Sequence, residues 1–243
     1  MIVLLTDFGL EGPYTGQVKA ALYRGAPGVP VIDLFSDLDP WNVDATAYLL
    51  AAYSADFPEG TVFLTVVDPG VGSDRLSAVI KADDRWYVGP HNGLFELVVR
   101  RASSVRWWDI TRIPDHLSAS FHGRDLFAPE AAKLANGQEP DGQLVDAATR
   151  RFPEMPDDLA QIVYVDRYGN GITGLRASMV DPKVVLEINS LKVNSARTFS
   201  DMPQGAAFWY ANSNGLVEIA ANQERANQAF GFEVGTCIEL SRD

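Results

Sequence analysis

The sequence predicts an α/β protein with a three-layer α/β N-terminal domain at residues 1–150, a linker at 151–158, and a smaller C-terminal β-barrel domain at residues 159–243. Three observations lead to this prediction. Short apolar runs alternate with helical patterns over the first two-thirds of the chain, a polar segment with several prolines follows, and beyond it the helical period largely disappears. With 243 residues, the chain is long enough for one large domain or two unequal ones.

The first domain alternates strands and helices. Ile2 to Leu5 is a continuous apolar run, as expected of a strand buried on both faces. The elements expected after it are a helix over Gln17–Arg24, a strand over Val29–Leu34, a helix over Val43–Tyr53, a strand over Thr61–Val67, a hairpin of Ser77–Lys81 and Arg85–Val88, a helix over Leu94–Arg101, a strand over Val105–Ile110 and a helix over Leu126–Asn136. This alternation predicts a parallel or mixed sheet in a three-layer arrangement.

Turn residues and apolar spacing mark the limits of these elements. Apolar residues recur at helical spacing in the second helix, at Tyr48, Leu49 and Ala52. Pro58-Glu59-Gly60 forms a turn before the third strand, and Ala82-Asp83-Asp84 closes the hairpin. Gly137 ends the last helix, because glycine is favoured just past a helix C-terminus.

The C-terminal part is expected to be all-β. Arg151 to Asp158 is polar and contains two prolines, which is typical of a linker. Short strands separated by Gly/Asn turns then predict a small barrel or sandwich, with strands at Gln161–Asp166, Val184–Ile188, Ala206–Ala211, Val217–Ala220 and Glu233–Leu240. Cys237 lies in the last of these strands and cannot form an internal disulfide, because it is the single cysteine; we expect a buried, inert thiol.

The charge balance excludes some classes of partner. With 20 Lys+Arg and 32 Asp+Glu, the net charge is −12, which disfavours nucleic acid and anionic membranes. We expect the first residues to form a strand rather than a signal peptide, and no apolar run is long enough to span a membrane. We therefore expect a cytoplasmic protein that binds a small molecule.

Polar clusters at strand ends are the candidate ligand sites, because ligands of open α/β sheets collect at the carboxyl ends of strands. Asp7 follows the first strand and is either a ligand for a vicinal diol or the cap of a turn. Asp68 follows the third strand, and the tight loop after it lets Arg75 fold back onto Asp68, either as part of a site or as a loop clamp.

The segment Gly70-x-Gly72 is not a nucleotide motif. It lacks the third glycine and the following helix of a dinucleotide fingerprint, and it lacks the Lys-Ser/Thr of a phosphate loop. His122, next to a glycine at a helix start, is a candidate acid–base group or a surface histidine. Asp68, His122 and Asp125 are too scattered to predict a metal site, so no metal is expected.

Several motifs occur together and span nearly the whole chain: Thr6-Asp7-Phe8-Gly9, Pro40-Trp41, Val67-Asp68-Pro69-Gly70-Val71-Gly72 with Arg75, Pro90-x-Asn92-Gly93-Leu94, Phe121-His122-Gly123-Arg124-Asp125, Asp166-Arg167-Tyr168-Gly169-Asn170, and Asn212-Ser213-x-Gly215 with Glu218-Ile219-Ala220. In this order they resemble the S-adenosyl-L-methionine (SAM) hydrolase family, also called SAM hydroxide adenosyltransferases, which is related to fluorinase and chlorinase. The resemblance implies a homotrimer with each active site between the N-terminal domain of one subunit and the C-terminal domain of its neighbour.

The resemblance also implies the reaction and the roles of residues. Activated water attacks the ribose C5′ of SAM and releases adenosine and L-methionine, with SAM as substrate and no cofactor. Asp68, Arg75 and His122 match the triad that holds and deprotonates the water. The matching substrate-binding residues are Asp7 and Trp41 at the ribose, Asp166 and Ser213 at the methionine end, Tyr168, Asn170 and the segment near Asn222 at the adenine, and Phe121 beside the triad.

Two alternatives and two departures qualify this hypothesis. One alternative is a non-catalytic adenosine or SAM binding protein, and the other is a SAM-dependent halogenase. The halogenases carry Tyr and Thr where this chain has Asp68 and Val71, so the resemblance favours water over halide. His91 stands where the family usually has Asp, and Asn214 stands where the halogenases have Arg, so the contacts of the family are not assigned to these two positions.

Overall fold

A computed structural model describes residues 1–241 of the chain, and it divides into two compact units, Met1–Met155 and the segment that begins at Pro156. The first unit contains the strands β1 (Ile2–Thr6), β2 (Val31–Phe35), β3 (Val62–Val66), β4 (Ser77–Ala82), β5 (Arg85–Pro90), β6 (Val105–Ile110) and β7 (Gly142–Val145), and the helices α1 (Tyr14–Gly25), α2 (Val43–Tyr53), α3 (Glu96–Arg101) and α4 (Ala128–Ala135). Helix α4 follows directly on a π-helical turn, Gly123–Phe127.

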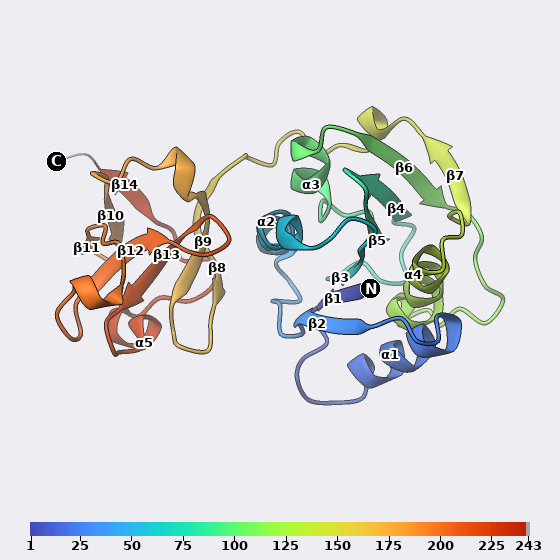
Figure 1. Ribbon diagram of the computed structural model, residues 1–243, viewed down its shortest axis with the longest axis horizontal. Coiled ribbons are helices and arrows are strands. Elements are labelled where there is room, and N and C mark those ends of the chain that lie inside the picture. Colours follow the sequence, from blue (N-terminus) through green and yellow to red (C-terminus); the bar gives the residue numbers. More distant parts are fainter. Residues whose placement is uncertain (242–243) are drawn as a thin grey trace. The chain divides into compact units, whose positions relative to one another are not determined.

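The first unit is a mixed sheet between two helical layers. The strand order is β2-β1-β3-β5-β4-β6-β7; β2, β1, β3 and β5 are parallel neighbours, whereas β4 is antiparallel to both β5 and β6. Helix α1 packs beside α4 and α2 packs beside α3, on opposite faces of the sheet (Figure 1). The predicted mixed α/β sheet is therefore confirmed.

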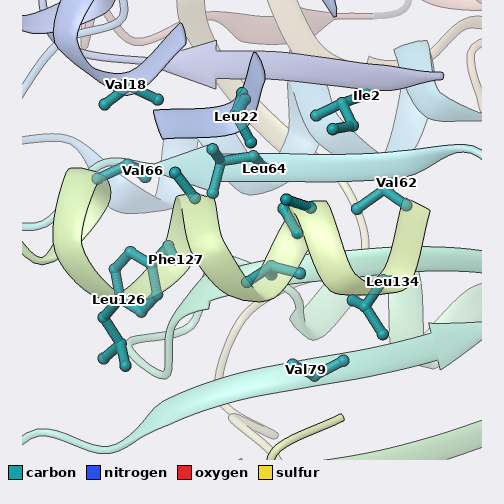
Figure 2. Packing of buried hydrophobic residues seen from close by; sticks show 14 of the residues in the cluster. Ile2, Val18, Leu22, Val62, Leu64, Val66, Val79, Leu126, Phe127 and Leu134 are labelled. Atoms are coloured by element: carbon teal, nitrogen blue, oxygen red, sulfur yellow. The ribbon is translucent and has the colours of Figure 1, made fainter. Parts of the chain in front are cut away.

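Packing against a helical layer on each face explains why the central strands are apolar along their whole length. Ile2, Leu64 and Val79 point toward α1 and α4, where they pack against Leu22 and Phe127 (Figure 2). The alternate residues of the same strands face the other helical layer: the ring of Phe63 stacks on that of Tyr87, whose centroid lies 5.1 Å away. Both faces of the central strands β1 and β3 are thus buried, as the continuous apolar runs predicted.

The sequence patterns missed strand β7. Gly142 begins an edge strand that pairs antiparallel with β6, and no strand was expected between Asn136 and Gln161. A Cβ atom at Gly142 would lie 2.5 Å from the carbonyl oxygen of Asp109, so glycine permits this close pairing. The strand is short and its Leu144 is 55% exposed, so it has no apolar alternation to predict it.

Part of the expected linker at 151–158 packs on the first unit. The side chain of Glu96 is 1% exposed and accepts hydrogen bonds from Arg151 Nε and the Phe152 backbone N–H, at 3.0 and 2.9 Å from Oε2. Arg100 Nη1 donates to the Met155 carbonyl at 2.7 Å. The buried carboxylate of Glu96 therefore holds this polar segment against α3, which a reading of its polarity alone could not show.

The second unit contains β8 (Leu159–Val165), β9 (Gly171–Arg176), β10 (Val185–Ile188), β11 (Leu191–Val193), β12 (Ala207–Ala211), β13 (Leu216–Ala221), β14 (Glu239–Ser241) and the short helix α5 (Ala226–Phe230). Its ladders form a four-stranded sheet, β12-β13-β9-β8, and a three-stranded sheet, β11-β10-β14. An all-β unit was expected, but these ladders, within the described residues, do not by themselves close into a barrel.

Two details of the last expected strand were wrong. Residues 233–236 form a turn, with the Thr236 N–H donating to the Glu233 carbonyl, so the strand begins only at Glu239. Cys237 is exposed rather than buried, because it pairs through a single bridge with Gln161 and lies outside the ladder that would cover it. Across residues 1–241, no helix is both long and apolar enough to cross a membrane.

Candidate active site

The site in the first unit begins where two parallel strands end together. Thr6 of β1 lies opposite Val66 of β3, and the Asp7 N–H donates to the Val66 carbonyl at 3.2 Å. This register brings Asp7 and Asp68 to the same edge of the sheet. Asn92 supports the edge, because its Nδ2 donates to the Val67 carbonyl at 2.9 Å.

The loop after β3 folds Arg75 back onto Asp68, as its composition predicted. Arg75 Nε donates to Asp68 Oδ1 at 2.7 Å and Nη2 donates to Oδ2, so the pair is bidentate. The two side chains are 10% and 5% exposed, respectively. Arg75 Nη1 also donates to Ser77 Oγ at 2.9 Å, which fixes the orientation of the guanidinium.

Gly72 allows this loop to approach the segment that carries His122. Its φ is +81°, and a Cβ atom there would lie 2.6 Å from the Ala119 carbonyl oxygen. A side chain would therefore force the two segments apart. The close approach lets Arg75 reach a histidine that is 47 positions away along the chain.

His122 accepts a hydrogen bond from the Asp68–Arg75 pair. Its Nδ1 lies 3.1 Å from Arg75 Nη2, and because a guanidinium has only donors, Nδ1 is the acceptor. The ring proton therefore lies on Nε2. Burial, followed by the positive charge of Arg75, lowers the pKa of His122, which keeps the ring neutral near pH 7.

Asp68 and His122 face a cavity of about 520 Å³, whereas Arg75 lies behind them and does not line it. Among its lining residues are four of the predicted site residues, Asp7, Asp68, Phe121 and His122. Burial raises the pKa of Asp7 from its usual 3.8 to about 6, backbone N–H groups oppose this effect, and the charge of Asp68 adds to it. The cavity thus joins two carboxylates, an imidazole and an aromatic wall, and it can hold a small polar reactant next to an apolar group.

A second cavity, of about 620 Å³, lies in the C-terminal unit. Asp166, Tyr168 and Asn170 line it, and Asp166 Oδ1 accepts from the backbone N–H groups of Tyr168 and Asn170 at 2.8 and 2.9 Å. The turn needs Gly169, whose φ is +86° and where a Cβ atom would lie 2.5 Å from Asn227 Oδ1. Carboxylate, aromatic ring and amide therefore share one concave surface.

The remaining predicted residues line neither cavity. Trp41 is 80% exposed, and Ser213 Oγ donates to Asn214 Oδ1 at 3.1 Å within the turn after β12. Asn222 Nδ2 donates to the Met202 carbonyl at 2.7 Å. His91 contacts the Arg150 carbonyl through Nε2 at 3.0 Å, so the family departure at this position lies away from the site.

The sequence patterns missed several cavity residues. In the first unit, the ring of Tyr14 packs edge-on against Phe121, with centroids 5.4 Å apart, and no local pattern marks it. In the second unit, Glu218 lines the cavity although it lies within an otherwise apolar strand and is 5% exposed. A lone carboxylate in a buried strand is the signal that could have identified Glu218.

Fold and site together define the class: an α/β enzyme whose carboxylate, guanidinium and imidazole groups meet at the carboxyl ends of parallel strands, with a separate β unit that carries a second polar cavity. Family models then identify the family. The SAM hydroxide adenosyltransferase N-terminal domain matches residues 2–143 and the corresponding C-terminal domain matches residues 160–239, so the chain belongs to this family, and the predicted resemblance is confirmed.

Proteins of known sequence or structure are similar to this chain over nearly its full length. An "(R)-S-adenosyl-L-methionine hydrolase" of Thermus thermophilus is 39% identical over 98% of each chain, and one of Salinispora arenicola is 34% identical over 99% of this chain and 97% of its own. A "Fluorinase" of Nocardia brasiliensis is 23% identical over 99% of this chain and 96% of its own. A crystal structure of an uncharacterized conserved protein from Thermotoga maritima matches all of both chains, with a TM-score of 0.88 and 32% identity.

Proposed function

We propose that this protein hydrolyses SAM to adenosine and L-methionine. The observation that carries the proposal is the cluster of Asp68, Arg75 and His122 at a cavity that Asp7 also lines, in a chain similar over its whole length to proteins named (R)-S-adenosyl-L-methionine hydrolases. In the reaction a water oxygen bonds to C5′, the C5′–S bond breaks, and its electron pair stays on sulfur as a neutral thioether. One proton is released.

The reaction requires the protein to position the nucleophile and to exclude bulk water. Substitution at a saturated carbon needs the nucleophile about 3 Å from C5′ and in line with the leaving sulfur. Attack on a sulfonium also removes charge in the transition state, so a site that excludes bulk water favours it. The buried side chains of Asp68 and Arg75 supply fixed charges in such a site.

Each member of the cluster has a distinct role in this proposal. Arg75 orients the Asp68 carboxylate through two hydrogen bonds. His122, whose Nδ1 is engaged by Arg75, presents Nε2–H to the oxygen of the attacking water. Asp68 retains free lone pairs, so it orients the water and takes its proton.

Asp7 is proposed to bind the ribose hydroxyls, because an ionised carboxylate offers two acceptors to a vicinal diol. Its neighbour Phe121 provides the apolar wall for the sugar. In the C-terminal unit, Asp166 is proposed to bind the methionine end, with Tyr168 and Asn170 near the adenine. We keep three roles that the family resemblance implies: Trp41 contacts the ribose, Ser213 the methionine end, and Asn222 the adenine.

The reaction itself is tested with purified protein and SAM of defined sulfur configuration. We expect adenosine and methionine by chromatography, faster from the (R) epimer, and ¹⁸O from labelled water in the 5′-hydroxyl of adenosine. Tight binding without turnover would support the non-catalytic alternative. A halogenated nucleoside formed with added chloride or fluoride would support the halogenase alternative instead.

The cluster is tested with Asp68→Ala and His122→Ala. Each should lower kcat at least about a hundredfold, with the Kd for SAM within about threefold, because these groups act on the water and not on the bound substrate. His116→Ala is the control, since His116 is exposed and lines neither of the two cavities. Full activity in either cluster variant would remove it from the mechanism.

We further propose a homotrimer in which the N-terminal unit of one subunit and the C-terminal unit of a neighbour form each site. Each polar cavity is lined by residues of one unit alone, which is consistent with a site that needs both units. Mixing inactive His122→Ala and Asp166→Ala subunits should restore about a quarter of wild-type activity, the fraction of sites that combine two intact halves. No restoration after subunit exchange would place the site within one chain.

We also propose that the C-terminal unit closes as a small barrel. The Ile238 N–H donates to the Ala160 carbonyl at 2.8 Å, and the Ala196 N–H donates to the Trp209 carbonyl at 3.0 Å, so backbone bonds link the edges of its two sheets. Closure would leave no free edge and would stiffen the loop that carries Asp166. Hydrogen exchange should then protect the Ile238 and Ala196 amides as strongly as those within the ladders; rapid exchange at both would indicate two separate sheets.

A further inference from the structure

Glu218 is a buried carboxylate that the proposed mechanism does not use. It lies in the middle of β13, is 5% exposed and lines the cavity of the C-terminal unit. Its Oε1 accepts from the Tyr210 hydroxyl at 2.5 Å, and its Oε2 accepts from Asn212 Nδ2 at 3.1 Å. Within residues 1–241 no lysine or arginine forms an ion pair with Glu218, so these neutral donors stabilise it instead.

The first partner segment of Glu218 is the loop 166–170. The Asn170 side chain hydrogen-bonds to Glu218 and also donates from Nδ2 to Asp166 Oδ2 at 3.1 Å. Asn170 is itself 5% exposed, so it forms a buried bridge between the two carboxylates. The position of Asp166, on which the methionine end is proposed to bind, therefore depends on Glu218.

The second partner segment is the turn 212–215, which carries Ser213. Asn212 Oδ1 accepts from the backbone N–H groups of Asn214 and Leu216, both at 3.0 Å, while its Nδ2 donates to Glu218. One side chain thus defines the turn and joins it to the carboxylate. Glu218 consequently holds both segments that the family resemblance assigns to the methionine end.

The chemistry of this arrangement suits a cationic amine. A carboxylate has about four acceptor positions, and the three donors from Tyr210, Asn212 and Asn170 leave one available. Burial raises the pKa of Glu218, the three hydrogen bonds oppose this shift, and the charge of Asp166 adds to it. A cation between Asp166 and Glu218 would relieve their mutual repulsion.

We propose that Glu218 is a positioning residue that holds Asp166 and the 212–215 turn for recognition of the α-ammonium group of an amino-acid substrate. The inference rests on the proposed function, since the amino-acid end meant here is that of SAM. It assigns to Glu218 the selection of substrates that carry the amino group over analogues that lack it.

The test uses Glu218→Gln, which keeps the size of the side chain but presents an NH₂ donor to a group that is already a donor. For SAM, KM should rise about tenfold with kcat within about twofold, the loss expected for one hydrogen bond to a charged group. For the deaminated analogue, in which a butyrate replaces the amino-acid end, KM should change less than about twofold. Glu233→Gln, at an exposed position of the same unit, is the control.

A second variant separates positioning from general damage to the fold. Glu218→Gln combined with Asn212→Asp exchanges amide and carboxylate and restores a donor–acceptor pair, so KM for SAM should return to within about threefold of wild type. An equal rise in KM for both substrates, no rise for SAM, or no recovery in the double variant would overturn the proposal. Wild-type turnover of SAM tests the proposed function separately; if it is absent, the same ratios measured as Kd still test Glu218.

Discussion

Replacing Asp7 by asparagine should make the N-terminal unit more stable while it weakens substrate binding. Burial raises the pKa of Asp7 from 3.8 to about 6, so at neutral pH the folded protein carries a carboxylate that its surroundings disfavour. A difference of about two pH units corresponds to at most about 3 kcal/mol. Partial contact with solvent reduces this to about 1–2 kcal/mol, which Asp7→Asn should recover.

The gain in stability of Asp7→Asn should depend on pH, because it reflects the ionisation of Asp7 in the wild-type protein. Between about pH 4 and pH 6 the folded protein holds the Asp7 proton more tightly than the unfolded chain does, so this residue lowers stability progressively as pH rises through that window. Asparagine has no such proton. The stability difference between variant and wild type should therefore widen by about 1 kcal/mol from pH 5 to pH 8.

Urea denaturation followed by tryptophan fluorescence, at equal protein concentration and at both pH values, measures this difference. Asp74→Asn is the matched control, since Asp74 is exposed in the loop between Asp68 and Arg75. Calorimetric binding of SAM should weaken at least about tenfold in Asp7→Asn, because the amide offers a single acceptor to the ribose diol. A stability difference that is the same at pH 5 and pH 8 would refute the reasoning from burial.

Two further predictions follow from contacts in the first unit, and a third concerns metal ions. Glu96→Ala should destabilise the protein by about 3 kcal/mol in urea denaturation, because it removes the buried partner of Arg151; a change below about 1 kcal/mol would contradict this. Gly89→Ala should lower stability by about 2 kcal/mol or more, since its Cβ would lie 2.1 Å from the Thr65 carbonyl oxygen; an unchanged melting temperature would show that the strands separate freely. Activity should survive dialysis against a chelator, because within residues 1–241 no group of three or more His, Cys, Asp or Glu side chains is placed to bind a metal ion. A loss of activity that added zinc or magnesium restores would contradict a reaction that uses water and protein groups alone.

Much of the fold was accessible from local patterns. Continuous apolar runs such as Ile2–Leu5 predicted strands buried on both faces, and the turn residues around Gly72 predicted that Arg75 returns to Asp68. Where local patterns were weak, the prediction failed. The edge strand β7 has no apolar alternation, and Cys237 lies just outside the ladder that was expected to bury it.

The candidate site was likewise predictable from the sequence only in part. Asp7 and Asp68 could be named because each follows an apolar run, and His122 because a glycine and a helix start flank it. Local patterns could not bring them into one cavity, and only the family resemblance implied it, since the cavity depends on the pairing of Thr6 with Val66 and on a contact across 47 positions. Glu218 was named only as part of a motif and was given no role, because its role comes from Tyr210, Asn212 and Asn170, which reach it only in the folded unit.

The sequence by itself therefore determined the α/β and all-β character of the two parts, the family to which the chain belongs, and the chemical groups available for a reaction on a sulfonium substrate. These properties depend on apolar spacing, turn residues and motif order, which act between close neighbours in the chain. Only the tertiary structure decided that Arg75 also donates to His122, that burial shifts the pKa of Asp7, and that Glu218 joins two distant segments. Hydrogen-bond geometry and desolvation depend on which distant groups come into contact, and that is set by the register of the sheets and the packing of whole elements against them.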